Sequence, residues 1–205
     1  ADREVILTCP ECGEETKGDQ CDKCLHVPTS EELIGGNCIV CGSKTVQRDN
    51  KILYLRLPDF QKEIEAHTAE VEGNWRVNAR NETRKYLKQG LVERAVTRDL
   101  DWGVEIPVDG YEDKRMYVWI DAVLGYLTDT MRVCEERGLD WEDFWKEGRD
   151  NKIYMCHGKD NIVFHSIILN ALLLGQKENY HLVDTIVSTE YLNFNDQKCS
   201  KRKKI

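Results

Sequence analysis

The sequence predicts an α/β fold with a parallel, doubly wound sheet, preceded by a small cysteine-rich unit. After Gly90, short apolar runs alternate with helical stretches, whereas residues 1–45 are rich in Cys, Gly, Asp and Thr and show no sustained periodicity. Strands separated by helices of this length are typical of βαβ crossovers. We expect strands at Met116–Ile120, Lys152–Cys156 and Thr185–Thr189, and helices at about Asp121–Arg137 and Phe164–Leu174.

A helical pattern also covers Leu57–Lys88. Side chains suited to one buried face recur at spacings of three, four or seven, the period of an amphipathic helix. They are Phe60, Ile64 and His67, then Trp75, Ala79 and Tyr86. We expect two helices joined near Gly73, with Gly90 as the stop signal.

Composition and charge narrow the function classes. The 205 residues include 29 Lys and Arg and 37 Asp and Glu, for a formal net charge of -8. Nucleic-acid binding through bulk charge needs a basic face, so we expect no DNA binding and only local RNA contact. No apolar run approaches the roughly 20 residues of a membrane span, and residues 1–8 lack a signal-peptide pattern. We therefore expect a soluble, cytoplasmic protein.

Six of the nine cysteines form three C-x2-C pairs before residue 42. In a reducing compartment this pattern indicates metal ligation rather than disulfides. Four thiolates favour Zn²⁺, and a full set of protein ligands makes the ion structural rather than catalytic. The alternative is four buried free thiols. The predicted ligands are Cys9, Cys12, Cys21 and Cys24.

The other cysteines have different interpretations. Cys38 and Cys41 form a third pair without two obvious further ligands, which is either a partly filled second site or a vestigial knuckle. Cys134 and Cys156 lie in predicted regular structure and are interpreted as core residues. His26, alone after the fourth cysteine, is interpreted as a surface residue rather than a ligand. The sequence thus predicts one zinc ion per chain.

Five motifs, in order, resemble those of methionyl-tRNA synthetases. The first two cysteine pairs, within Cys9-Pro-Glu-Cys-Gly13 and Gly18-Asp-Gln-Cys-Asp-Lys-Cys24, are similar to the zinc insertion of that family. Thr97-Arg-Asp-Leu-Asp-Trp-Gly103 is similar to the family's return into the catalytic domain, and Tyr117-Val-Trp-Ile-Asp-Ala-Val-Leu-Gly-Tyr126 is similar to its methionine-pocket segment. His157-Gly-Lys-Asp-Asn-Ile-Val-Phe-His165 is similar to its G-K-D segment. The fifth motif, Lys198-Cys-Ser-Lys-Arg202, stands at the place of the KMSKS loop.

The resemblance implies a class I synthetase: the C-terminal half of a Rossmann-type catalytic domain with a small zinc-knuckle insertion. It divides the chain into three parts. Residues 1–48 are the zinc-knuckle part of the insertion, and residues 49–100 are its helical remainder and the return to the catalytic domain. Residues 101–205 are the second half of the catalytic domain. The HIGH half and the anticodon-binding helices are expected outside this chain, which alone should not aminoacylate. An upstream C-x2-C pair, present in members with four knuckles, would explain the missing partners of Cys38 and Cys41.

The resemblance also implies the activity, ATP-dependent attachment of methionine to tRNA. The methionine carboxylate attacks the α-phosphorus of ATP, so the protein supplies positioning and charge stabilisation. The implied partners are methionine, ATP with Mg²⁺, and the acceptor end of tRNA(Met). An alternative of another class is a non-catalytic, zinc-stabilised paralogue that binds RNA or protein, which the altered Lys198–Arg202 loop suggests.

Within that loop, Lys198 and Lys201 match the two lysines of KMSKS and would neutralise the developing pyrophosphate. Cys199 and Arg202 depart from the motif. The two lysines that follow are interpreted as a solvated tail.

The substrate residues follow from the same resemblance. Trp119, Val123, Tyr126 and His165 match positions that enclose the methionine side chain, where aromatic rings contact the thioether; without the resemblance, the first and third would be ordinary core residues.

On the ATP side the matching residues are Gly158, Lys159, Asp160 and Ser200. The alternative for Asp160 is that it merely caps the following helix, and the two roles can coexist. Arg98 and Asp99 resemble residues that steer the insertion and the tRNA acceptor end, with a structural ion pair as an equal alternative.

Overall fold

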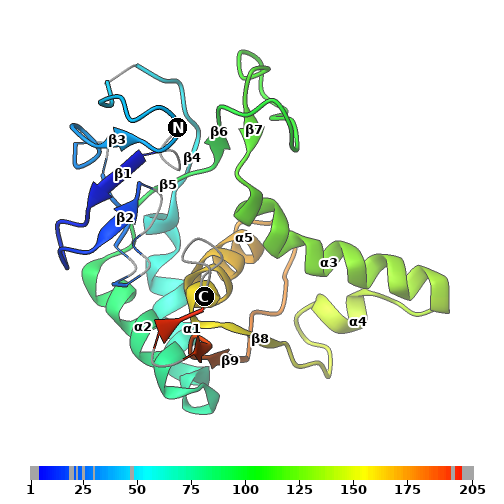
Figure 1. Cartoon of the computed structure of the whole chain (residues 1–205). Helices are drawn as coiled ribbons and strands as arrows, with labels where there is room; N and C mark the ends of the chain where they lie inside the picture. The colour runs from blue at the N-terminus through cyan, green and yellow to red at the C-terminus, as the bar shows by residue number, and fades with distance from the viewer. Residues whose placement is uncertain are drawn as a thin grey trace.

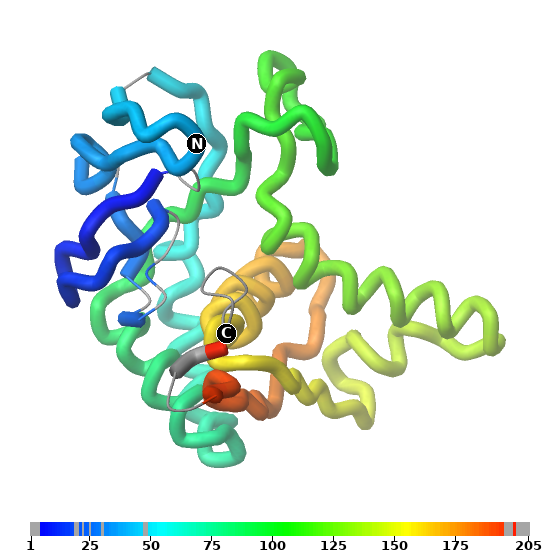
Figure 2. Tube along the Cα trace, viewed as in Figure 1, coloured from blue at the N-terminus to red at the C-terminus, as the bar shows by residue number. Residues whose placement is uncertain are grey.

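A computed structural model describes residues 5–18, 21, 23, 24, 26–29, 31–46, 49–194 and 197–199. Figures 1 and 2 show a small β unit at the N-terminal end, a pair of helices below it, and an α/β region from which one long helix projects. No helix in the described ranges has both the length and the apolar character needed to cross a membrane.

The N-terminal unit is an antiparallel sheet of three short strands in the order β2-β1-β3. The strands are β1 (Val5–Thr8), β2 (Glu15–Lys17) and β3 (Asn37–Cys38). Over the described residues, the main hydrophobic cluster has no buried member before Leu57. Cys9 and Cys21 are among the few buried side chains of this unit. Apolar burial alone is therefore a weak source of stability here, as expected for a metal-held unit.

Two helices follow and pack on the main core. A short antiparallel pair brackets them: β4 (Tyr54–Leu55) and β5 (Arg94–Ala95). Between the strands lie η2 (Leu57–Phe60), α1 (Gln61–Val71), η3 (Glu72–Asn74) and α2 (Val77–Gln89). The predicted break near Gly73 is confirmed, because Gly73 lies in η3. Gly90 ends α2 with a φ of 84°, a conformation that favours glycine.

The chain then forms β6 (Thr97–Arg98) and β7 (Arg115–Met116), an antiparallel pair, before the long helix α3 (Val118–Arg137) and the short α4 (Glu142–Trp145). The strand predicted at Met116–Ile120 is wrong, because α3 begins at Val118. Aromatic and β-branched residues favour a strand locally, yet Ile120 and Val123 are both buried at helical spacing. Tertiary packing overrides the local preference.

Residues 154–189 contain one parallel strand pair. β8 (Tyr154–Gly158) and β9 (Thr185–Thr189) run in register, and between them lie η4 (Lys159–Asn161), the π-helical η5 (Phe164–Ile168) and α5 (Leu169–Leu174). The short hairpin β10 (Asn193–Phe194) and β11 (Gln197–Lys198) follows. The strand predicted at Thr185–Thr189 is confirmed, and the one predicted at Lys152–Cys156 begins two residues later.

The α/β character of the prediction is confirmed, but its doubly wound sheet is not seen: in the described ranges, β8 and β9 are the only parallel pair. Cys134 is buried, as predicted. Cys156 is exposed, so its interpretation as a core residue is wrong. Alternate side chains of a strand face opposite sides, and in β8 the neighbouring Met155 faces the core.

Candidate functional site

The four predicted ligands form one cluster of thiols. The sulfur atoms of Cys9, Cys12, Cys21 and Cys24 all lie within 4.8 Å of one another. The Cys9 and Cys24 sulfurs are 3.6 Å apart, as are those of Cys12 and Cys21. A disulfide needs about 2.05 Å. Zn²⁺ with Zn–S bonds of about 2.3 Å holds sulfurs roughly 3.8 Å apart along a tetrahedron edge. The spacing therefore fits a tetrahedral metal ion.

The ionisation of these thiols also favours a cation. Burial opposes ionisation of Cys21, but the backbone N–H groups of Cys24 and Lys23 outweigh it and lower the pKa of Cys21 to about 6. Burial, with the neighbouring thiols, raises the pKa of Cys24 to about 12. Four thiols in contact cannot all ionise without a positive charge among them. A metal dication would supply that charge, so the cluster could hold a metal ion.

Cys38 and Cys41 lie outside that cluster, but the backbone turn that carries them is the same as the turn at Cys9 and Cys12. The Cys9 and Cys38 N–H groups each donate to the carbonyl five residues ahead, both at 2.8 Å. Gly13 and Gly42 each donate back to the first cysteine of the pair at 2.9 Å, with φ values of 72° and 71°. Cys41 is exposed and its thiol contacts the Ser43 hydroxyl at 3.2 Å. The third pair is thus a fully formed knuckle.

His26 does not join the cluster, as predicted. Its Nε2 lies 2.9 Å from a carboxylate oxygen of Glu32, and its carbonyl accepts the Cys21 N–H at 2.7 Å. Its role in the described unit is structural.

Three of the four predicted methionine-side residues lie on one face of α3. Trp119, Val123 and Tyr126 are spaced i, i+4 and i+7, so their side chains point to the same side of the helix. That side faces η5: the Trp119 ring stacks on Phe164 with centroids 4.9 Å apart. Val123 is 1% exposed and belongs to the core beneath.

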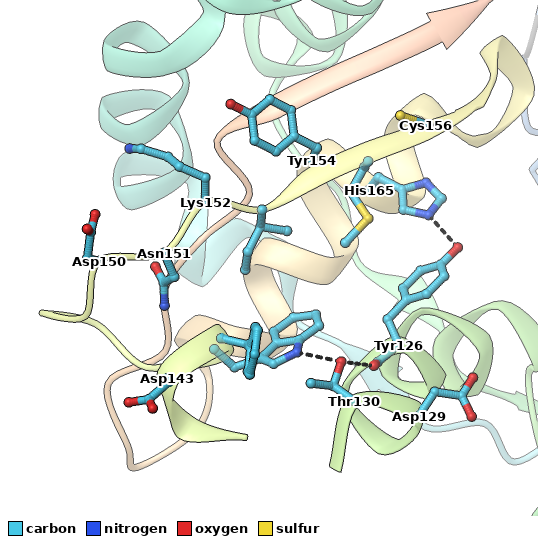
Figure 3. A pocket seen from close by; sticks show the side chains of 14 residues that line it. Tyr126, Asp129, Thr130, Asp143, Asp150, Asn151, Lys152, Tyr154, Cys156 and His165 are labelled. Carbon is cyan, nitrogen blue, oxygen red and sulfur yellow. Dashed lines mark hydrogen bonds between the residues drawn. The ribbon is translucent and has the colours of Figure 1, made fainter. Parts of the chain in front are cut away.

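The fourth residue, His165, contacts this face through Tyr126. Its Nδ1 lies 2.8 Å from the Asn161 carbonyl, which can only accept, so Nδ1 carries the proton. Its Nε2, 3.0 Å from the Tyr126 hydroxyl, therefore accepts the tyrosine proton. Figure 3 shows the two side chains pointing toward each other. Burial lowers the pKa of His165 to about 4, which keeps the ring neutral.

A second histidine supports this ring. His157, the fourth residue of β8, stacks on His165 with centroids 4.2 Å apart and planes 15° from parallel. Burial also lowers the pKa of His157, and its Nδ1 donates to the Gly158 carbonyl at 2.9 Å. The result is an uncharged imidazole pair at the end of β8.

An open cavity of about 840 Å³ lies beside His165, between α3, α4 and β8 (Figure 3). Tyr126 and His165 line it, together with Tyr154 and Cys156 on the exposed side of β8. Trp119 and Val123 do not. The structure therefore brings all four predicted residues to the α3–η5 contact but places only two at the cavity.

The predicted nucleotide-side residues follow directly from β8. Gly158 precedes η4, and a Cβ there would lie 2.8 Å from a carboxylate oxygen of Asp160, so the turn is tight. Asp160 is exposed and lies inside η4, whose N-cap is Gly158. The capping interpretation of Asp160 is therefore wrong.

Lys159 forms an ion pair across the two parallel strands. Its Nζ lies 2.8 Å from Glu190, just beyond β9, and 4.8 Å from the centre of the Tyr191 ring. The Glu190 carboxylate also accepts from Asn78 of α2 at 2.9 Å. The Lys159 ammonium, and then Asn78, lower the pKa of Glu190. The lysine is thus positioned at the carboxyl ends of both strands.

Some of the remaining predicted residues lie in the part of the chain that the structure describes. Asp99 forms an ion pair with the buried Lys114 and accepts from Asn50 at 2.9 Å, so the alternative of a structural ion pair holds for this carboxylate. The Arg98 guanidinium lies over the Tyr117 ring, 4.2 Å from its centre. The backbone of Lys198 pairs with Asn193 in the β10–β11 hairpin. Ser200, Lys201 and Arg202 lie outside the described residues.

Sequence reasoning missed Phe164, His157 and Glu190. Phe164 lies in the G-K-D segment directly before the predicted pocket residue His165, and its place in that motif is the signal that could have found it. The Lys159–Glu190 pair joins residues 31 apart, and no local pattern signals it.

Comparison with known proteins gives the class. The family model described as tRNA synthetases class I (M) matches residues 1–205. The chain belongs to this family and has its class I synthetase fold, with α/β content.

Among curated relatives, the chain is 45% identical over 201 residues to methionine–tRNA ligase 1 of Alkaliphilus oremlandii, covering 97% of this chain and 36% of that protein. It is 40% identical over 203 residues to the methionine–tRNA ligase of Borrelia recurrentis, covering 98% and 27%. The Mycobacterium tuberculosis methionyl-tRNA synthetase bound by methionyl-adenylate aligns with a TM-score of 0.61 at 22% identity, covering 82% of this chain and 32% of that one. The chain thus spans about a third or less of the length of these relatives.

Proposed function

We propose that this chain is the segment of a methionine–tRNA ligase that carries part of its active site. The observation that carries the proposal is the neutral, hydrogen-bonded Tyr126–His165 pair, whose imidazole stacks on His157, the residue before Gly158 at the carboxyl end of β8. Ligand sites in open α/β folds lie outside the carboxyl ends of the strands. Relatives named methionine–tRNA ligase along essentially the whole chain support this assignment.

Methionine binding would use the α3–η5 contact. A thioether is polarisable and packs well on aromatic faces. The stacked Trp119 and Phe164 rings and the buried Val123 offer an apolar wall, while Tyr126 and His165 offer polar groups at its edge. An uncharged His165 avoids placing a cation against the apolar substrate side chain.

ATP, with Mg²⁺, would bind on the neighbouring side. Gly158 allows close approach, Lys159 supplies a positive charge, and Asp160 can accept from ribose hydroxyls. Lys198, Ser200 and Lys201 would close over the phosphates. The methionine carboxylate oxygen attacks the α-phosphorus, pyrophosphate leaves, and the lysines stabilise the charge that develops on it. A hydroxyl of the acceptor end of tRNA(Met) would then attack the methionyl carbonyl carbon and displace AMP, with Arg98 and Asp99 near its path.

For the fold, we propose a specific type of α/β structure. We propose that β8, α5 and β9 form a βαβ unit of a Rossmann-type sheet. In the described residues, β9 is the only strand paired with β8, so one edge of β8 is free to pair. The proposed parts are residues 1–48, 49–100 and 101–205, in a cytoplasmic protein.

We further propose that the four-cysteine cluster holds one structural Zn²⁺, through Cys9, Cys12, Cys21 and Cys24. The sulfur spacing and the closed set of four thiols support zinc over ions that prefer oxygen ligands. The ion would stabilise the fold of the N-terminal unit.

The test is ATP–pyrophosphate exchange by the complete encoded protein. Exchange that requires methionine, and not leucine or isoleucine, is expected. Absence of methionine-dependent exchange from a folded, zinc-loaded protein would refute the proposed function.

A further inference from the structure

The helix that carries His165 has an unusual first turn. Phe164–Ile168 is π-helical, and the Leu169 N–H donates to the Phe164 carbonyl, five residues back. A π-turn displaces the regular bonding of each N–H to the carbonyl four residues back, and such turns are rare and occur frequently at functional sites. Side chains around this turn must therefore stabilise its π-helical hydrogen bonding.

Side chains satisfy carbonyls along this turn. The His165 ring donates to the Asn161 carbonyl at 2.8 Å, and the Asn170 amide donates to the Ser166 carbonyl at 3.0 Å. Each bond runs from a side chain to a carbonyl four residues back, the position a backbone N–H occupies in a regular α-helix.

Asn170 lies in α5, directly after the π-turn, and it is as fully buried as Ser166 but uses both ends of its side-chain amide. Its exposed fraction is 0%. While its nitrogen donates to Ser166, its oxygen accepts the Val183 N–H at 3.1 Å, on the segment that enters β9. The Ser166 hydroxyl is itself held by Thr83 of α2 at 2.9 Å. The π-turn is therefore anchored to two separate parts of the fold.

We propose that Asn170 is a positioning residue that holds the π-turn in the register in which His165 accepts from Tyr126. Asn170 does not line the cavity and acts through His165. In a regular α-helical turn, His165 would rotate by roughly the 100° that one residue subtends, taking Nε2 away from the Tyr126 hydroxyl. The inference rests on the proposed function only for its effect on methionine binding.

The first test measures the ring itself, without any enzymatic activity. Nitrogen NMR of the 205-residue chain should show His165 as the Nδ1-protonated tautomer. In Asn170→Leu, which keeps the branched shape and the number of side-chain heavy atoms but removes both amide hydrogen bonds, that tautomer should lose its dominance. An unchanged tautomer and unchanged Tyr126–His165 contact in folded Asn170→Leu would overturn the proposal.

The second test uses methionine-dependent exchange by the complete encoded protein. Asn170→Leu should raise the KM for methionine by up to about tenfold, the effect of losing one hydrogen bond, while the KM for ATP stays constant. In a His165→Phe background the same substitution should have no further effect on the KM for methionine. An additive effect would mean that Asn170 acts on stability alone, and would refute its role through His165.

The matched control is Ile186→Val, which removes one methyl-sized group from a fully buried position in β9 without touching a hydrogen bond of the turn. It should lower the melting temperature and leave the KM for methionine unchanged. If Asn170→Leu fails to fold, the smaller Asn170→Ala removes both amide hydrogen bonds without added bulk and should shift the His165 tautomer in the same direction; no shift would refute the proposal. Absence of exchange in the unsubstituted protein would refute the proposed function instead, because the tautomer measurement does not depend on it.

Discussion

Replacing Cys21 with serine tests whether the N-terminal unit depends on a metal. Cys21 is 0% exposed and its sulfur lies 3.6 Å from that of Cys12. A serine hydroxyl fits the space but does not ionise near neutral pH, so the substitution leaves three thiols. Zinc would lose one of four ligands and, with it, the closed tetrahedral shell.

The expected loss is large relative to the stability of the unit. Structural Zn²⁺ binds knuckle peptides with an apparent free energy of about 10–16 kcal/mol at pH 7, whereas whole domains are stable by roughly 5–15 kcal/mol. In the described part of the chain, the main hydrophobic cluster begins at Leu57. We therefore expect the segment 5–46 to unfold in Cys21→Ser while α1, α2 and the β8–β9 pair remain folded.

The assay combines zinc analysis with hydrogen exchange on the 205-residue chain. The unsubstituted chain should hold one zinc ion, and Cys21→Ser should lose it together with amide protection in β1 and β2. The matched control is Cys41→Ser, in the equivalent knuckle, whose exposed thiol lies outside the cluster; it should keep both. Retention of one zinc ion and full protection by Cys21→Ser would refute the reasoning.

Three further predictions concern the candidate active site. Tyr126→Phe removes the hydroxyl bonded to His165 and should raise the KM for methionine about fivefold, for roughly 1 kcal/mol, with little change in kcat; an unchanged KM would contradict this role. Lys159→Met should raise the KM for ATP but change the melting temperature little, because its pair with the exposed Glu190 is worth about 0–1 kcal/mol; a large fall in melting temperature would instead indicate a structural role. Burial lowers the pKa of His165 from 6.5 to about 4, so protonation of this ring destabilises the folded state. Its contribution to the free energy of unfolding should be fully present above about pH 6.5 and should decline as the pH falls from about 6.5 to 4. Urea denaturation across that range should show a smaller decline in His165→Phe, and an equal decline would refute the assignment.

The metal cluster was the part of the site most accessible to sequence reasoning. Two C-x2-C pairs separated by a short glycine-containing segment place four thiols within reach of one ion, whatever the rest of the fold does. The third pair shows the limit of the same reasoning. Cys38 and Cys41 form an equivalent turn, but whether they find two more ligands depends on chain far from them.

The helix α3 shows a different limit. Met116–Ile120 has the composition of a strand, and its helical conformation from Val118 follows from packing: Ile120 and Val123 are buried, while Val118 is 50% exposed. A local pattern of five residues cannot report which neighbours will cover it. The motif match nevertheless located Trp119, Tyr126 and His165 together, because a family motif encodes long-range packing that residue preferences do not.

The sequence by itself determined the α/β character, the helices around Gly73, the strand at Thr185–Thr189, the four-thiol site and the family resemblance. These depend on spacing and chemistry within short segments. Only the tertiary structure decided the neutral state of His165, its hydrogen bond to Tyr126, and the π-turn that the hydrogen bonds of Asn170 stabilise. Each of these depends on burial and on hydrogen bonds between segments 13 to 83 residues apart in the chain, such as Asn170 to Val183 and Thr83 to Ser166. Burial sets the charge of the ring, and the distant partners set its direction.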